Sequence, residues 1–191
     1  MIAGHFGFAA MVKARERSAP LWMLMLASVW LDIVFVPLFV AGIETIQPVQ
    51  GRLGYGSSLI HADYTHSIIG MLVLSAALGA IAWPKWGRRS AIVIGLVAVS
   101  HWALDLIVHR PDMPILPANA LQLPLLGFGL WQMPTASAAL ELTLVLAGAW
   151  LYWRAARAVC LKAQRGMRLA VIATLLIAAS GILILCLDLT S

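Results

Sequence analysis

Residues 90–114, SAIVIGLVAVSHWALDLIVHRPDMP, combine the two features that decide the fold. The first part is apolar and long enough for a membrane-spanning helix, which needs about 20 such residues. The second part carries His101, Asp105 and His109 at intervals of four residues, so that they share one helix face. Pro111 then ends the helix. Because hydrocarbon does not solvate an acid or an imidazole, this stretch predicts a membrane helix with a polar interior face.

The composition of the whole chain is typical of an integral membrane protein. Of its 191 residues, 62% are hydrophobic and 11% are charged, whereas a soluble domain carries roughly a quarter charged residues. The length predicts a single transmembrane helical domain over residues 1–191. The net charge of +5 does not indicate nucleic-acid binding, because the basic residues cluster in short segments between apolar runs. Cys160 and Cys186 match neither a disulfide framework nor a CxxC metal site.

The apolar runs predict an all-α bundle of about five transmembrane helices plus a short N-terminal half-helix. The half-helix, over residues 2–12, is too short to cross alone, and we expect it to be re-entrant or packed inside the bundle. Its charges follow its apolar part, the reverse of a signal peptide, so we expect it to stay in the mature protein. The five predicted spans are about 20–43, 61–84, 90–109, 134–156 and 168–188.

The basic residues predict the topology. They lie in three segments that share one face if the spans alternate, and the positive-inside rule assigns that face to the cytoplasm. Residues 44–60, residues 110–133 and the C-terminus are then outside. The segment 110–133 is mostly apolar, and its prolines exclude a continuous helix. We therefore expect it to lie in the outer interface or over the bundle as a lid. The basic segments are 13–17, 85–89 and 154–168.

The interiors of the predicted spans contain acids but no lysine or arginine. Asp32 and Asp105 are the deepest of these acids. A lone carboxylate at a helix centre costs on the order of 2.5–3.5 kcal/mol on insertion scales. These carboxylates must therefore be protonated, hydrated, paired with an imidazolium or bound to a metal ion. The alternative is a purely structural role, in which a buried hydrogen-bonded pair such as His101 with Asp105 holds helices together.

A metal site explains the acids and the histidines together. Imidazole and carboxylate suit Zn²⁺, and also Mn²⁺ or Fe²⁺, and helical bundles build such sites from inward-facing side chains. We expect candidate ligands from four segments to converge, with His109 as a further candidate. Asp63 and Glu141 are spare carboxylates that could act as the general base of a catalysed reaction. The converging candidates are His5, Asp32, His66, His101 and Asp105.

These motifs, taken in order, resemble those of the bacterial membrane-bound metal-dependent hydrolases. They are AGH near the start, the Asp of LDIVF, then YTHS, then SHWALD followed by MPILP. The resemblance implies the bacterial inner membrane, a distant similarity to zinc-dependent phospholipase C, and His5, Asp32, His66, His101 and Asp105 as ligands. Where relatives often read PDIDH, this chain reads LDIVF, so that Asp63, His109 or Asp112 would have to supply a missing ligand. The chain is also similar to short bacterial proteins loosely called permeases.

The sequence is compatible with three functions. The first is a metal-dependent hydrolase that acts on a lipid-like ester or phosphoester. The second is a small permease or ion pathway that uses the same side chains and requires several copies of the chain. The third is a non-catalytic accessory subunit. Membrane lipids are expected partners in each case, and no GxSxG, Walker-type loop or HExxH occurs.

Overall fold

The computed structural model describes residues 1–49, 57–164 and 166–190, and it is mostly helical, as the sequence predicts. Two short strands form an antiparallel ribbon that the sequence did not indicate, within the predicted outer loop 44–60; residues 50–56 of that loop lie outside the described residues. The elements are α1 (Ile2–Arg15), α2 (Leu21–Ser28), α3 (Trp30–Val40), β1 (Thr45–Pro48), β2 (Ser58–His61), α4 (Ile68–Val108), the 3₁₀ helices η1 (Pro117–Gln122) and η2 (Leu130–Gln132), α5 (Pro134–Lys162) and α6 (Arg168–Thr190).

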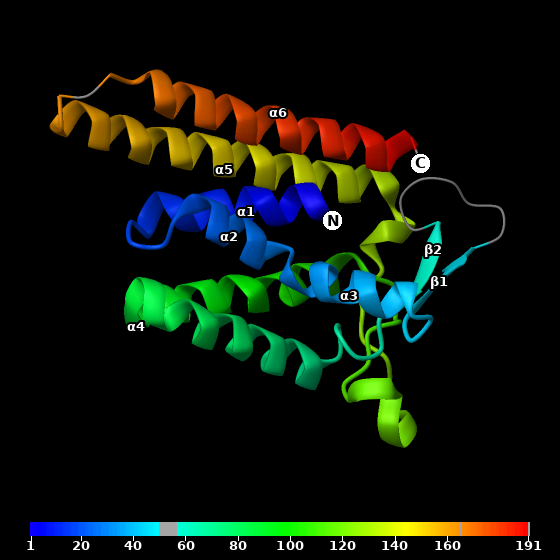
Figure 1. The fold of residues 1–191 in the computed structure, drawn as a ribbon. Coiled ribbons are helices and arrows are strands. Elements are labelled where there is room, and N and C mark those ends of the chain that lie inside the picture. The colour runs from blue at the N-terminus through cyan, green and yellow to red at the C-terminus, as the bar shows by residue number, and fades with distance from the viewer. Residues whose placement is uncertain (50–56, 165, 191) are drawn as a thin grey trace.

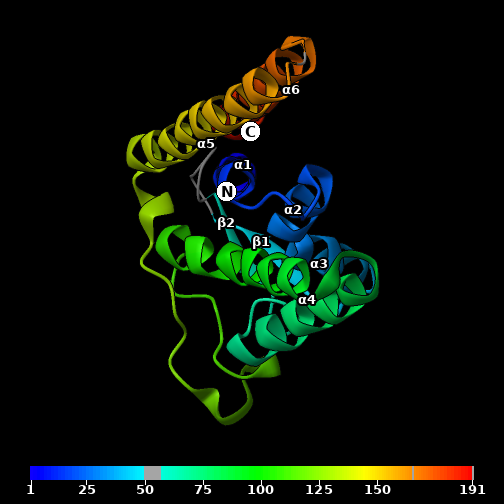
Figure 2. The same cartoon turned by 90° about the vertical axis from the view of Figure 1, so that its left-hand side faces the viewer.

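Helix α4 consists of two arms that fold back on each other at Gly87 (Figures 1 and 2). Gly87 has φ 76° and ψ 167°, a conformation that glycine adopts without a steric penalty. The arms approach closely because small residues face each other. A Cβ added to Gly79 would lie 3.8 Å from the Cα of Gly95, and 3.1 Å from the carbonyl oxygen of Ala91. The break lies within the basic segment 85–89, where the sequence predicts the loop between two spans.

Three described helices are long and apolar enough to cross a membrane: α4, α5 and α6. A fourth crossing results if α2 and α3, which meet at an angle of 49°, form one broken span. The fold is thus an all-α bundle consistent with a membrane protein. The expected number of about five spans requires that each arm of α4 crosses separately, and it stays a prediction.

The three basic segments lie at one end of the bundle, and the β-ribbon and most of residues 110–133 lie at the other (Figure 1). A buried carboxylate joins two of the basic segments. Glu16, which follows α1, accepts a hydrogen bond of 3.0 Å from Nε of Arg89 in α4. Close by, the rings of Trp22 and Trp86 meet edge to face, with 5.6 Å between their centroids. The assignment of this end to the cytoplasm remains a prediction.

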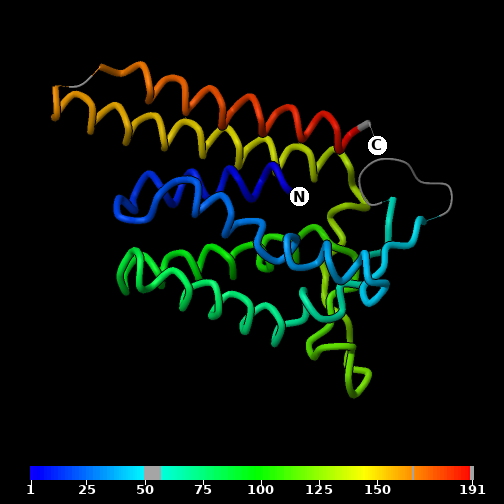
Figure 3. The backbone as a smooth tube through the Cα atoms, in the orientation of Figure 1, coloured from blue at the N-terminus to red at the C-terminus, as the bar shows by residue number. Residues whose placement is uncertain are grey.

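Helix α1 lies in the interior, between α5 on one side and α2 and α4 on the other (Figures 2 and 3). Two glycines bring α1 and α5 into backbone contact. A Cβ added to Gly7 would lie 2.4 Å from the carbonyl oxygen of Leu144, and one added to Gly148 would lie 2.2 Å from the carbonyl oxygen of Gly7. This crossing fixes the depth of α1 in the bundle, and with it the position of His5.

We expect Gly148→Ala to destabilise the bundle, because the new methyl group would overlap the backbone of α1. Overpacking of this kind costs about 1–3 kcal/mol. Thermal unfolding of the purified protein in detergent measures the effect as a lower midpoint. Gly166→Ala is the matched control, since nothing lies within 4 Å of a Cβ added there. Equal midpoints for the two variants would contradict the proposed contact.

The carboxylate of Glu16 makes the stability of the basic end depend on pH. Hydrogen bonds from the Ser18 hydroxyl and amide, with Arg89 adding to them, lower the pKa of Glu16 from 4.5 to about 2. A carboxylate with a depressed pKa stabilises the fold above its unfolded pKa and loses this effect as pH falls from about 4.5 towards 2. We expect Ser18→Ala to lower the unfolding midpoint at pH 6 more than Arg89→Gln does, because the Arg89 side chain is 80% exposed and screened by water. The opposite order would contradict this assignment.

Candidate metal centre

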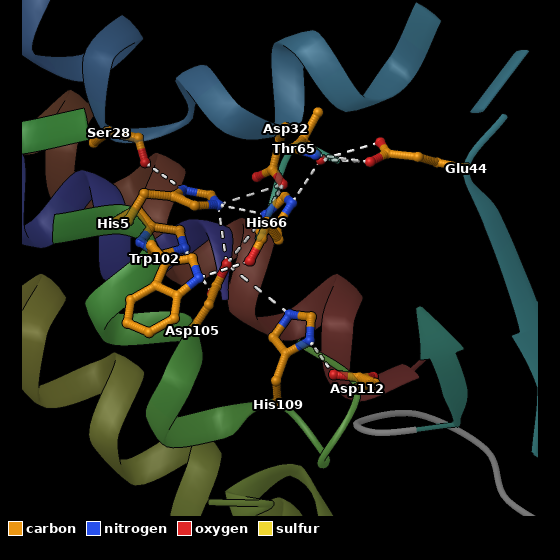
Figure 4. Close-up of polar contacts among 11 residues, drawn as sticks. His5, Ser28, Asp32, Glu44, Thr65, His66, Trp102, Asp105, His109 and Asp112 are labelled. Carbon is orange, nitrogen blue, oxygen red and sulfur yellow. Dashed lines mark hydrogen bonds and ion pairs between the residues drawn. The ribbon is translucent and has the colours of Figure 1, made fainter. Parts of the chain in front are cut away.

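The five predicted ligands converge from four parts of the chain, and Figure 4 labels four of them, His5, Asp32, His66 and Asp105. His5 comes from α1, Asp32 from the first turn of α3, and His66 from the turn before α4, while His101 and Asp105 come from the second arm of α4. Four of these side chains are buried, and that of Asp32 is 38% exposed. The prediction that these residues come together is therefore supported by the structure, and together they form a buried His/Asp cluster that could hold a metal ion.

His66 does not lie inside a helix, as the predicted span 61–84 required. The hydroxyl of Ser67 accepts a hydrogen bond from the Gly70 amide and caps α4, which therefore begins at residue 68. His66 and Asp63 lie in the preceding turn. Trp102 of the second arm holds this turn in place through a 2.7 Å hydrogen bond from its indole nitrogen to the His66 carbonyl. The turn, and not a helix face, aims the His66 ring at α4.

The distances within the cluster suit a small metal ion. Nε2 of His101 lies 2.9 Å from Oδ2 of Asp105 and 3.2 Å from Nε2 of His66. Oδ1 of Asp32 lies 3.5 Å from Nε2 of His101 and 3.6 Å from Nε2 of His66. Around a tetrahedral ion with bonds of about 2.0–2.1 Å, neighbouring ligand atoms lie about 3.3 Å apart. These four distances are close to the spacing that such an ion requires. Two sets of three donors lie close enough to share an ion, namely Asp32 with His66 and His101, and His5 with His101 and Asp105.

In both His66 and His101, the Nδ1 atom points away from the cluster and has a hydrogen-bond acceptor as its partner. Nδ1 of His101 lies 2.8 Å from the carbonyl oxygen of Ser28, which can only accept, so this nitrogen carries the proton. Oγ1 of Thr65 lies 3.0 Å from the carboxylate of Glu44 and donates to it. Nδ1 of His66, at 2.9 Å, therefore donates to Oγ1 of Thr65. Such outer partners are typical of histidines that bind a metal through the other nitrogen.

The two Nε2 atoms lie 3.2 Å apart, and both present lone pairs when neither of them carries a proton. Two lone pairs at this distance repel each other unless a positive charge lies between them. The carboxylates of Asp32 and Asp105 beside them add two negative charges. A divalent cation would neutralise both negative charges and bind both lone pairs. A single proton shared by the two nitrogens would neutralise only one of the two charges.

The break between α2 and α3 supplies one of these outer partners. Helix α2 ends at Ser28 and α3 begins at Trp30, so the carbonyl of Ser28 is available to a side chain. The same break places Asp32 in the first turn of α3, where the helix dipole stabilises a negative charge. A continuous helix over the predicted span 20–43 would remove the carbonyl acceptor.

His5 contacts the other oxygen of Asp105. Its Nε2 lies 3.1 Å from Oδ1, and its ring stacks on His101 with centroids 4.0 Å apart. Within the described part of the chain, the buried Nδ1 of His5 has no hydrogen-bond partner. His5 thus orients Asp105 and belongs to the wider set of donor atoms, beside the pair formed by His66 and His101.

His109 extends the cluster along α4, as the spacing of four residues predicts. Its Nε2 lies 3.9 Å from Oδ2 of Asp105, and its Nδ1 lies 3.0 Å from Oδ1 of Asp112. Asp112 in turn accepts a hydrogen bond from the amide of Ile60 in β2. The ring of His109 is further fixed by Trp131, with centroids 4.2 Å apart. His109 therefore has the same arrangement as His66, with an outer acceptor and an inward Nε2.

The two predicted general bases lie apart from this core. Glu141 of α5 is buried, and its Oε2 accepts a 3.1 Å hydrogen bond from the amide of Gly4, next to His5. Asp63 has a carbonyl that accepts a bond from the amide of Ala118, and no polar contact among the described residues joins its carboxylate to the cluster. Their catalytic role stays a prediction.

Glu44 is the important residue that sequence reasoning missed. It is fully buried and accepts hydrogen bonds of 2.8 Å from the amides of Tyr64 and Thr65, besides the bond from the Thr65 hydroxyl. The sequence predicts that Glu44 lies in the outer segment 44–60. Its one signal is that no other charged residue lies between Asp32 and Arg52.

Comparisons with protein-family models, with curated proteins and with solved structures gave no significant match. The resemblance to membrane-bound metal-dependent hydrolases stays a prediction, which rests on the motifs alone. The geometry of the cluster has to carry any functional conclusion.

We expect Thr65→Val to weaken Zn²⁺ binding by about 10–100-fold, because it removes the outer partner that orients His66. Competition with a chromophoric chelator measures the affinity. Thr143→Val is the control, since the hydroxyl of Thr143 is exposed and donates to the carbonyl of Ala139 in its own helix. Unchanged affinity in Thr65→Val would mean that His66 is not a ligand.

Proposed function

We propose that the protein is a membrane-embedded metal-dependent hydrolase that acts on a lipid-like ester or phosphoester. The observation that carries the proposal is the pair of facing Nε2 atoms of His66 and His101, beside the carboxylates of Asp32 and Asp105. Buried acids in a membrane bundle mark functional sites by default.

The four core side chains would hold the ion, with His5 and His109 completing its surroundings. Mixed imidazole and carboxylate donors favour Zn²⁺, and they also accept Mn²⁺ or Fe²⁺. A bound divalent ion supplies a Lewis acid that polarises an ester oxygen and makes water more acidic. Glu141 or Asp63 would serve as the general base that accepts the proton of water.

The surroundings of Asp32 support a lipid-like substrate. Asp32 is the most exposed of the core side chains. The helix that carries it also exposes apolar side chains, with Ile33 at 43% and Val36 at 56%. An ester group could reach the cluster past Asp32 while its hydrocarbon chain stays along α3, and the apolar segment 110–133 would border this route.

The proposal includes the placement in the membrane. If each arm of α4 crosses separately, and α2 with α3 forms one broken span, the crossings number five together with α5 and α6. The positive-inside rule then puts the basic end in the cytoplasm. The metal centre would lie in the outer half of a bacterial inner membrane, with the C-terminus outside.

A proton or ion pathway is the second candidate, because the polar groups are connected. Hydrogen bonds run from Glu44 through Thr65 to His66, and a proton on either Nε2 would extend the series across the 3.2 Å to His101. Such a series could relay protons across part of the bundle. Proton or metal flux into liposomes, lost in Asp105→Asn, would favour this candidate over the hydrolase.

The test combines metal content with turnover. We expect gently purified protein to contain stoichiometric metal by elemental analysis, and to cleave fluorogenic lipid esters or phosphoesters. His101→Ala should lose both the metal and the activity, because it removes one of the two facing nitrogens. His61→Ala is the control, since His61 lies on β2, outside the metal-binding sets. A metal-free wild-type protein, or a His101→Ala variant with unchanged metal content, would overturn the proposal.

A further inference from the structure

A hollow of about 600 Å³ lies at the basic end, where the end of α1 meets α5 and α6. In Figure 1 this is the end opposite the β-ribbon, remote from the metal centre. Alanines of α5 and α6 leave the space open, among them Ala155, Ala156 and Ala173. The volume is within the range of small-molecule sites, which measure about 300–1,000 Å³.

Two cations line this groove. Lys13 is fixed at its edge, because its Nζ donates to the carbonyls of Arg17 and Ala19 at 3.0 and 2.7 Å. An ammonium has three donors, so one remains for a ligand. The Arg17 side chain is exposed and also lines the groove. None of the described lining residues is acidic, and the nearby Glu16 is occupied by Ser18 and Arg89. The groove therefore favours an anion.

The rest of the lining is apolar and opens towards the surroundings of the bundle. Leu169 is 79% exposed and Leu176 is 64% exposed, so the rim of the groove would face hydrocarbon in a membrane. A second apolar groove of about 470 Å³ shares Ala173 and Leu176 with the first and continues between α6 and α2, past Met25. Together the two form a long apolar channel with cations at one end.

We propose that this channel binds one anionic phospholipid, with its phosphate at Lys13 and Arg17 and an acyl chain along α6. Basic pockets between transmembrane helices bind anionic headgroups in this way. A soluble anion would use the two cations but leave the apolar channel unfilled. A zwitterionic lipid would bring a third cation, its own headgroup ammonium, close to Lys13 and Arg17. The site is independent of the metal centre and of the proposed hydrolase activity.

Native mass spectrometry of the full chain tests the proposal, with phosphatidylglycerol and phosphatidylcholine of identical acyl chains as probes. We expect one phosphatidylglycerol to be retained in preference to phosphatidylcholine. Arg17→Gln should lower its affinity about fivefold, the contribution of one basic side chain near an anionic lipid surface. Ala173→Phe should also reduce retention, because it fills the point where the two grooves join.

Arg15→Gln is the matched control, since it removes the same charge from an exposed position of α1 that does not line the groove. Equal retention of the two lipids would overturn the proposal. So would an equal loss of phosphatidylglycerol in Arg15→Gln and Arg17→Gln, because this would indicate a diffuse charge effect. If Ala173→Phe lowers the unfolding midpoint, Ala156→Leu takes its place, and full lipid retention in that variant would also contradict the site.

Discussion

The buried carboxylate of Asp105 is the constraint on which the rest of the structure depends. It is 3% exposed and lies within 4 Å of the imidazoles of His5, His66, His101 and His109. These rings come from α1, from the turn before α4 and from α4 itself, so a single acid sets the relative positions of three segments. A buried charge without partners would cost several kcal/mol. A shift of any one of these segments would therefore remove an imidazole partner from the buried Asp105 carboxylate and raise the cost of burying its charge.

Helix α5 positions α1, and with it His5, although α5 contributes none of the four core side chains. Because Gly148 has no side chain, the backbone of α1 can pack directly against it. The carboxylate of Glu141 accepts a hydrogen bond from the amide of Gly4. Both contacts act on the turn of α1 that carries His5. A side chain larger than hydrogen at this crossing would push α1 away from α5, towards α2 and α4, and would displace His5 from its position beside Asp105. The geometry of the His/Asp cluster thus depends on a helix-to-helix contact on the far side of α1.

Helical periodicity was sufficient to predict the part of the site that lies on one helix. His101, Asp105 and His109 share a face because they are four residues apart, and the acids without internal cations indicated that other segments must meet them. The outer partners were not predictable in the same way. The carbonyl of Ser28 becomes an acceptor only because α2 stops there, and Glu44 reaches Thr65 only through the turn and ribbon that follow α3. Such partners depend on where helices break, which hydrophobic patterns locate poorly.

The charges of the two ends of the bundle explain why a cation in the centre would be part of folding. At the basic end, the buried acid Glu16 is balanced within the protein by Arg89. At the His/Asp cluster, the ion pairs among the described residues join Asp32 and Asp105 to imidazoles and not to lysine or arginine. Two of these imidazoles are turned so that their outer nitrogens donate and their inner nitrogens face each other. If both inner nitrogens are unprotonated, they bind a metal ion and repel each other without one, so that metal binding and assembly of the bundle would be thermodynamically linked.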